Sequence, residues 1–92
     1  MRPSWKAVVS AVEQVKGEKW DRFRDRYGDW GRNVALLLGR RECGLKLGEL
    51  GKLCGGLDYR TVGSAVRKAM NQLKEDRNLV RTYEFLRNRI KS

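Results

Sequence analysis

The segment LGELGKLCGGLDYRTVGSAVRK, residues 47–68, contains the features that decide the fold. A short apolar stretch ends at the glycine pair Gly55-Gly56, and Asp58 then precedes a longer stretch with apolar residues at helical spacing. Asp is a preferred helix N-cap, and paired glycines between periodic segments are typical of a tight turn. These proportions predict a helix-turn-helix over about residues 46–75.

The sequence on either side of this segment has the same helical periodicity, with glycines between the periodic stretches. We expect one domain of residues 1–92 with six helices, which run from Ser4 to Gly17, Trp20 to Gly28, Asp29 to Arg41, Leu47 to Cys54, Asp58 to Leu73 and about Asn78 to Ile90. The second helix is expected to carry Trp20, Phe23 and Tyr27 on one inward face. No strand-like alternation is present, so the predicted fold class is all-α.

The charge balance indicates a polyanionic partner. Lys and Arg number 21 and Asp and Glu number 11, which gives a formal net charge of +10. Cationic side chains that neutralise phosphates release condensed counterions, and this release drives binding to nucleic acids. Charge alone does not separate DNA from RNA or from an anionic membrane surface.

The residue types that are missing exclude several functional classes. The chain has no His, so it lacks the commonest general base and the commonest zinc ligand. Two cysteines, Cys43 and Cys54, are too few for a tetrahedral zinc site or a disulfide framework, and we expect both to be buried thiols. We therefore expect no enzyme activity, metal, cofactor or small-molecule substrate. Without a long apolar run, we expect a soluble cytoplasmic protein with no membrane contact.

The predicted fifth helix has a polar face that suits base reading. Its apolar residues share one side, which leaves Tyr59, Arg60, Gly63, Ser64, Arg67 and Lys68 on the other. Side chains in the first turns of an inserted helix reach base edges in the major groove. The pattern therefore favours binding of double-stranded DNA. The alternative is a basic helical module that binds RNA or another protein.

The same residues resemble a known family. The motifs are Arg32-Asn33-Val34-Ala35-Leu36, then Leu47-Gly48-Glu49-Leu50-Gly51, then Gly55-Gly56-Leu57-Asp58-Tyr59-Arg60-Thr61-Val62. In this order and spacing they look like the C-terminal DNA-binding domain of the replication initiator DnaA. The likeness runs without gaps over about residues 32–68, and the Gly-Gly-x-Asp-x-x-Thr-Val segment is its most specific part.

Three positions differ from that family. Leu57, Tyr59 and Arg60 stand where the initiators have Arg, His and Ser or Thr. Residues 43–53 followed by Leu57-Asp58-Tyr59 look more like the DnaA-like tail of REP-associated tyrosine transposases. Those enzymes use a His-hydrophobe-His metal motif, which this chain lacks. The resemblance therefore implies the non-catalytic DNA-binding part of a DnaA-related or transposase-related protein.

The resemblance also implies roles for individual residues. Asp58, Tyr59, Arg60 and Thr61 would face the major groove, and Leu47 and Gly48 would lie against the DNA backbone. Arg32 and Arg40 would contact phosphate or the adjacent groove, and Arg24 would correspond to a minor-groove arginine. Together with the exposed face of the fifth helix, the candidate DNA-binding residues are Arg24, Arg32, Arg40, Leu47, Gly48, Asp58, Tyr59, Arg60, Thr61, Ser64 and Arg67.

Several of these residues also have structural interpretations. Asp58 caps its helix whether or not it also accepts a hydrogen bond from cytosine. Tyr59 could stack, donate to a phosphate or fill space at the turn. Gly48 and Gly51 cost about 1 kcal/mol each in a helix relative to Ala. Close approach of the recognition helix backbone at Gly51 and of a DNA phosphate at Gly48 would explain them. The three tryptophans are expected in the core.

Overall fold

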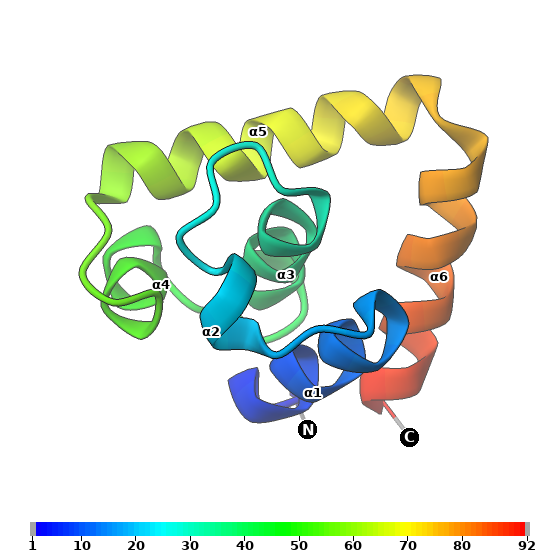
Figure 1. Ribbon diagram of the computed structural model, residues 1–92, viewed down its shortest axis with the longest axis horizontal. Helices are drawn as coiled ribbons and strands as arrows, with labels where there is room; N and C mark the ends of the chain where they lie inside the picture. Colours follow the sequence, from blue (N-terminus) through cyan, green and yellow to red (C-terminus); the bar gives the residue numbers. More distant parts are fainter. Residues whose placement is uncertain (1, 92) are drawn as a thin grey trace.

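The computed structural model describes residues 2–91, which form six α-helices and no strand. The helices are α1 (Trp5–Lys16), α2 (Trp20–Phe23), α3 (Trp30–Arg41), α4 (Leu47–Leu53), α5 (Tyr59–Glu75) and α6 (Arg77–Lys91). The long α5 lies across one side of the molecule, with α4 beside its start and α6 turning away from its end (Figure 1). The predicted all-α class with six helices is confirmed.

Helix α3 is the centre of the fold. Its residues from Gly31 to Gly39 are all buried, and it contacts α1, α4 and α5. A helix with neighbours on several sides needs apolar or small residues around its circumference. At Gly39 the absence of a side chain allows close packing, since a Cβ there would lie 2.6 Å from Leu50 and 2.8 Å from the Trp5 ring.

Side-chain caps fix where the helices begin. The Ser4 hydroxyl accepts a hydrogen bond from Ala7 N at 3.1 Å, and the Asp29 carboxylate accepts from Gly31 N and Arg32 N at 2.8 and 3.1 Å. Asp58 accepts from Arg60 N at 3.2 Å. Each cap satisfies N–H groups that have no partner within the helix. The predicted helix starts at these three caps are confirmed.

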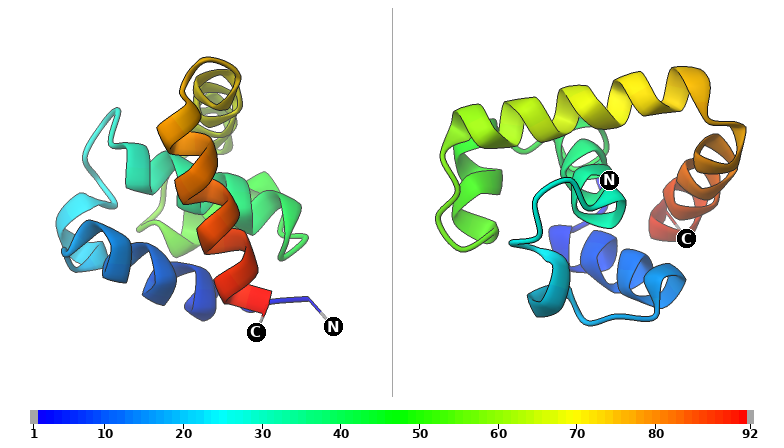
Figure 2. Two further views of the ribbon diagram at one scale, coloured as in Figure 1. Left: turned by 90° about the vertical axis from the view of Figure 1, so that its right-hand side faces the viewer. Right: turned by 45° about the horizontal axis from the view of Figure 1, so that its top comes forward.

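The first and last helices close the core. Helix α6 buries Leu79, Tyr83, Leu86 and Ile90 and contacts α1, which lies near it in Figure 2. Arg87 and Lys91 of α6 pair with Glu42 at 3.2 Å each, which ties α6 to the end of α3.

The predicted second helix is wrong in its extent. Helix α2 is a single turn that ends at Phe23, and Tyr27 lies outside it with 78% of its surface exposed. After Phe23 the chain turns and leads to the buried Asp29, which caps α3 and pairs with Lys16 and Arg26. Four apolar residues at helical spacing, Val15, Leu53, Met70 and Val80, are at least 36% exposed.

Candidate nucleic-acid interface

The connection between α4 and α5 is held in one conformation by backbone contacts. Gly55 and Gly56 have φ of 81° and 94°, a region that favours glycine. The Gly51 carbonyl accepts hydrogen bonds from Gly56 N at 3.0 Å and Leu57 N at 2.9 Å. A Cβ at Gly51 would collide with the Leu57 carbonyl oxygen. A second backbone therefore does approach Gly51, but it belongs to the turn before α5 and not to the recognition helix that was expected there. This packing fixes the angle at which α5 leaves α4.

The first turns of α5 present a polar face on the side opposite the core. Val62, Ala65, Val66 and Ala69 are buried, while the candidates on the other side are exposed or half-buried: Asp58, Tyr59, Arg60, Thr61, Ser64 and Arg67. The Arg60 guanidinium lies 5.9 Å from the centre of the Tyr59 ring. Among residues 2–91 no carboxylate pairs with Arg60. This cation is therefore available to an external anion or base.

The start of α4 lies beside this face. Leu47 is half-buried, with its side chain 3.6 Å from the position of a Cβ at Gly63 on α5. Gly48 is exposed, and a Cβ there would meet nothing within 4 Å. No intramolecular packing therefore requires glycine at position 48, in contrast to Gly51.

Two of the candidate arginines are held by contacts within the chain. Arg24 is half-buried against the turn, its guanidinium 3.4 Å from the position of a Cβ at Gly55, and it contacts Asp21 and Asp25 at 3.9 and 3.5 Å. Arg40 is exposed and donates to the Leu45 carbonyl at 3.2 Å, just before α4. The fold thus brings Arg24 next to the α4–α5 connection and Arg40 next to the start of α4.

Arg32 lies deeper than its expected role suggests, with 4% of its surface exposed. Its side chain reaches a small hollow of about 180 Å³ between α3, α5 and the loop before α3. Tyr27 and Lys68 line the same hollow, and neither was among the predicted site residues. Lys68 belongs to the polar face of α5 and could have been included on that signal. Tyr27 was assigned to the core by its spacing.

A buried ion-pair network holds the loop that carries Arg24 and Tyr27. The Lys16 ammonium donates to both Asp29 carboxylate oxygens, at 2.9 and 2.8 Å, and Arg26 donates to Asp29 at 3.0 Å. Burial acts to raise the pKa of Asp29, but the hydrogen bonds from Lys16 and from the Arg32 backbone N–H outweigh it, and the pKa is lowered. The Asp29 carboxylate is therefore charged at neutral pH. Its charge ties the end of α1 to the start of α3.

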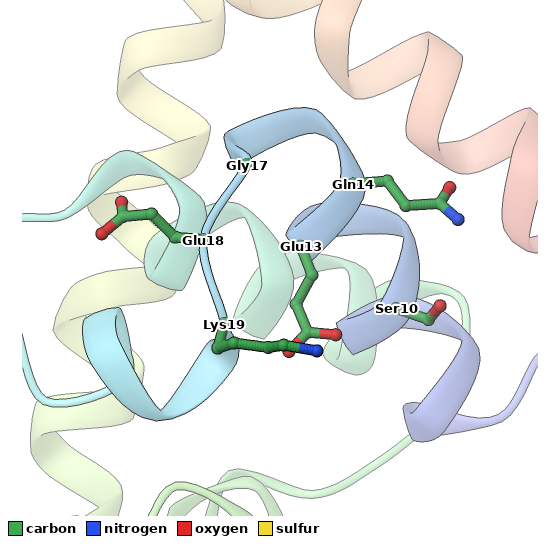
Figure 3. A pocket seen from close by; sticks show the side chains of 6 residues that line it. All are labelled: Ser10, Glu13, Gln14, Gly17, Glu18 and Lys19. Carbon is green, nitrogen blue, oxygen red and sulfur yellow. The ribbon is translucent and has the colours of Figure 1, made fainter.

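The two thiols and Glu13 lie outside the candidate interface. Cys54 is buried, which raises its thiol pKa to about 11, and Cys43 is half-buried. A hollow of about 380 Å³ lies beside α1, and Figure 3 labels the residues that line it: Ser10, Glu13, Gln14, Gly17, Glu18 and Lys19. Glu13 accepts a hydrogen bond from Trp20 N at 2.8 Å. Within residues 2–91 no three His, Cys, Asp or Glu side chains are placed to share a metal ion, and no helix has the length and apolar character of a membrane span.

The chain is similar to the chromosomal replication initiator protein DnaA of Mycoplasma capricolum subsp. capricolum. The two sequences are 36% identical over 90 residues, which cover 89% of this chain and 20% of that protein. The chain therefore spans about a fifth of the length of the curated relative it matches. No protein-family model matches the chain. The expected likeness to DnaA is confirmed at the level of sequence.

Proposed function

We propose that this chain binds double-stranded DNA through a helix-turn-helix formed by α4 and α5, and that it catalyses no reaction. The observation that carries the proposal is the exposed start of α5, where Arg60 has no carboxylate partner among residues 2–91, in a chain similar to DnaA. Helix α5 would be the recognition helix, and α4 would support it from the side of the DNA backbone.

The geometry of the α4–α5 pair suits the major groove. An α-helix fits into this groove and reads base edges with side chains from its first turns. In this chain those turns carry Asp58, Tyr59, Arg60 and Ser64 on the exposed side, while α3 packs on the buried side. Arg60 can place its planar fork on guanine O6 and N7, and this pairing is the commonest specific contact between protein and DNA.

Affinity would come mainly from phosphate contacts. The net charge of +10 favours a polyanion, and phosphate contacts position a protein on duplex DNA without reading its sequence. If about six phosphates are neutralised, the logarithm of the binding constant falls against the logarithm of salt concentration with a slope near −5. Arg40, at the end of α3 and next to the start of α4, is suited to such a contact.

The finer part of the proposal is that this domain serves a transposase-related protein. Leu57, Tyr59 and Arg60 depart from the initiators, and residues 43–53 followed by Leu57-Asp58-Tyr59 resemble the transposase tails. Tyr59 and Arg60 would be among the first to meet base edges, so the two groups of proteins should prefer different sites. Selection of bound sequences from random duplexes separates them, since recovery of the DnaA box would assign the chain to the initiators.

The decisive experiment compares Arg60→Ala with Arg81→Ala by fluorescence anisotropy on a selected duplex and on an unrelated duplex. Both arginines are exposed and helical, but Arg81 lies on α6, so Arg81→Ala removes the same charge at a position away from α5. Loss of a bidentate guanine contact costs about 1–3 kcal/mol, so Arg60→Ala should weaken the selected duplex about 5- to 150-fold and the unrelated duplex little. Thermal unfolding should change little for either variant.

Two results would overturn parts of the proposal. Equal losses on both duplexes would make Arg60 a phosphate contact and remove base reading by α5. A salt slope shallower than about −2, or equal binding of single-stranded RNA and duplex DNA, would instead favour a basic module of another class.

A further inference from the structure

We infer that the segment before α1 forms part of the DNA interface, and that Arg2 binds a phosphate of the DNA backbone next to the one proposed at Arg40. The inference deepens the proposed function and rests on it for the source of the phosphate. Arg2 was not among the predicted site residues, and the segment that carries it lies outside the helix-turn-helix. The contact would extend the interface beyond α4 and α5 to a third part of the chain.

The segment before α1 is held against the fold. Pro3 is the only proline of the chain and is half-buried. Its ring fixes its own φ and confines the preceding residue, Arg2, to extended backbone. Trp5 anchors the start of α1, because its ring lies 2.8 Å from the position of a Cβ at Gly39 and packs edge-on against Trp20 with 5.5 Å between ring centres. Arg2 is therefore presented from a short and anchored segment.

The Arg2 side chain lies over the connection between α3 and α4. A Cβ at Gly44 would collide with the Arg2 guanidinium, so Arg2 occupies the space that the missing Gly44 side chain leaves. Gly44 has a φ of 71°, a region that favours glycine. The connection is fixed to the end of α3, because Leu45 N donates to the Gly39 carbonyl at 3.1 Å. Arg2 thus rests on a fixed part of the backbone.

Arg40 contacts the same connection. Its guanidinium donates to the Leu45 carbonyl at 3.2 Å. Gly44 and Leu45 are consecutive residues, whose Cα atoms are about 3.8 Å apart. The two guanidiniums therefore lie against neighbouring residues, just before the start of α4, which is the part of α4 proposed to meet the DNA backbone. A phosphate next to the one at Arg40 is the partner within reach of Arg2.

The connection gathers positive charge that the fold does not neutralise. Its exposed cations are Arg2, Arg40, Arg41 and Lys46. No carboxylate pairs with any of them among residues 2–91. Glu42 in the same stretch is bound by two cations of α6 at 3.2 Å each, and Glu49 accepts from Lys46 N at 3.0 Å. A group of cations without counter-ions favours a polyanion, since each phosphate contact releases condensed counterions.

The first test compares Arg2→Gln with Arg81→Gln by fluorescence anisotropy on a selected duplex and on an unrelated duplex. One lost phosphate contact makes the salt slope shallower by about 0.9, so the affinity of the unchanged chain relative to Arg2→Gln should fall about 3.5-fold between about 50 and 200 mM salt. Both duplexes should be affected alike, because phosphates carry no sequence code. Arg2 is exposed and lies outside the helices, so the unfolding temperature should not change. Arg81→Gln, on α6, is the matched control and should keep the slope.

The second test uses duplexes in which one phosphate at a time is replaced by a neutral methylphosphonate. One position should weaken binding of the unchanged chain but not of Arg2→Gln, and it should lie beside a position that behaves in the same way with Arg40→Gln. An unchanged salt slope in Arg2→Gln, or a changed slope with no single position coupled to Arg2, overturns the inference and leaves the proposed function standing. Absence of duplex binding by the unchanged chain would overturn the proposed function, and the inference with it.

Discussion

Replacing Asp29 by asparagine isolates the charge of the buried network from its capping role. Asn is as good an N-cap as Asp, so the contacts to the first N–H groups of α3 can persist. The Lys16 ammonium, 6% exposed, would lose the carboxylate that is 4% exposed and bonded to it at 2.8 and 2.9 Å. Its remaining carboxylate neighbour, Glu18, is 3.5 Å away and 31% exposed.

Breaking a buried ion pair on one side costs about 3–5 kcal/mol, and the remaining Glu18 contact places this case near the lower end. For a chain of this size about 3 kcal/mol lowers the unfolding temperature by roughly 12–24 °C. The measurement is thermal and urea unfolding followed by circular dichroism. Asp25→Asn is the control, because that carboxylate is 67% exposed against Arg24 and should cost less than about 1 kcal/mol.

A double variant sharpens the comparison. Lys16→Met combined with Asp29→Asn removes both charges and should recover much of the stability that Asp29→Asn alone loses. The reason is that Lys16 lies against the Phe23 and Trp30 rings, where a Met side chain can pack. If Asp29→Asn cost no more than Asp25→Asn, the pair would behave as a surface contact. The stated role of the network in holding the loop before α3 would then be wrong.

Two further predictions concern acid and glycine. The pKa of Asp29 is lowered in the folded chain, so the charged carboxylate stabilises the fold above the unfolded pKa, near 4. This stabilisation is lost as the pH falls through the folded pKa. The acid-induced drop in unfolding temperature should therefore be smaller in Asp29→Asn than in the unchanged chain. Gly51→Ala should destabilise the fold by about 1–3 kcal/mol, because the added methyl meets the Leu57 carbonyl. Gly48→Ala should stabilise it by up to about 1 kcal/mol, because the added methyl meets nothing within 4 Å. Urea unfolding of both variants measures these changes, and equal effects would contradict the prediction.

Local signals in the sequence predicted most of the fold. Helix caps and apolar periodicity depend on neighbours within a few positions of the chain. The caps at Ser4, Asp29 and Asp58, together with the spacing of apolar residues, therefore predicted six helices. Tyr27 shows where this failed. Its spacing from Phe23 continues a helical face, but α2 ends at Phe23. The residues that follow lead to Asp29, which Lys16 of α1 holds, and a contact between such distant segments leaves no local pattern in the sequence.

Those features of the candidate site that depend on residues close in sequence could be predicted, and those that depend on packing between distant segments could not. The exposed face of α5 follows from the apolar period of that helix, which assigns Arg60 and Ser64 to the side away from the core. The burial of Arg32 depends on how α3 is surrounded, and no pattern near residue 32 reports this. The contact of Tyr27 with Lys68 joins residues 41 positions apart, so only the packed structure shows it.

The pairing of α1 with α6 has a kinetic consequence. Helices α3, α4 and α5 are neighbours in sequence and can associate after closing short loops, whereas the Gln14–Arg89 contact spans 75 residues. Contacts of such high contact order carry a larger entropic cost and tend to form late. Interactions that are absent from the transition state act mainly on the unfolding rate. We therefore expect that weakening the α1–α6 contact speeds the opening of the domain more than it slows folding.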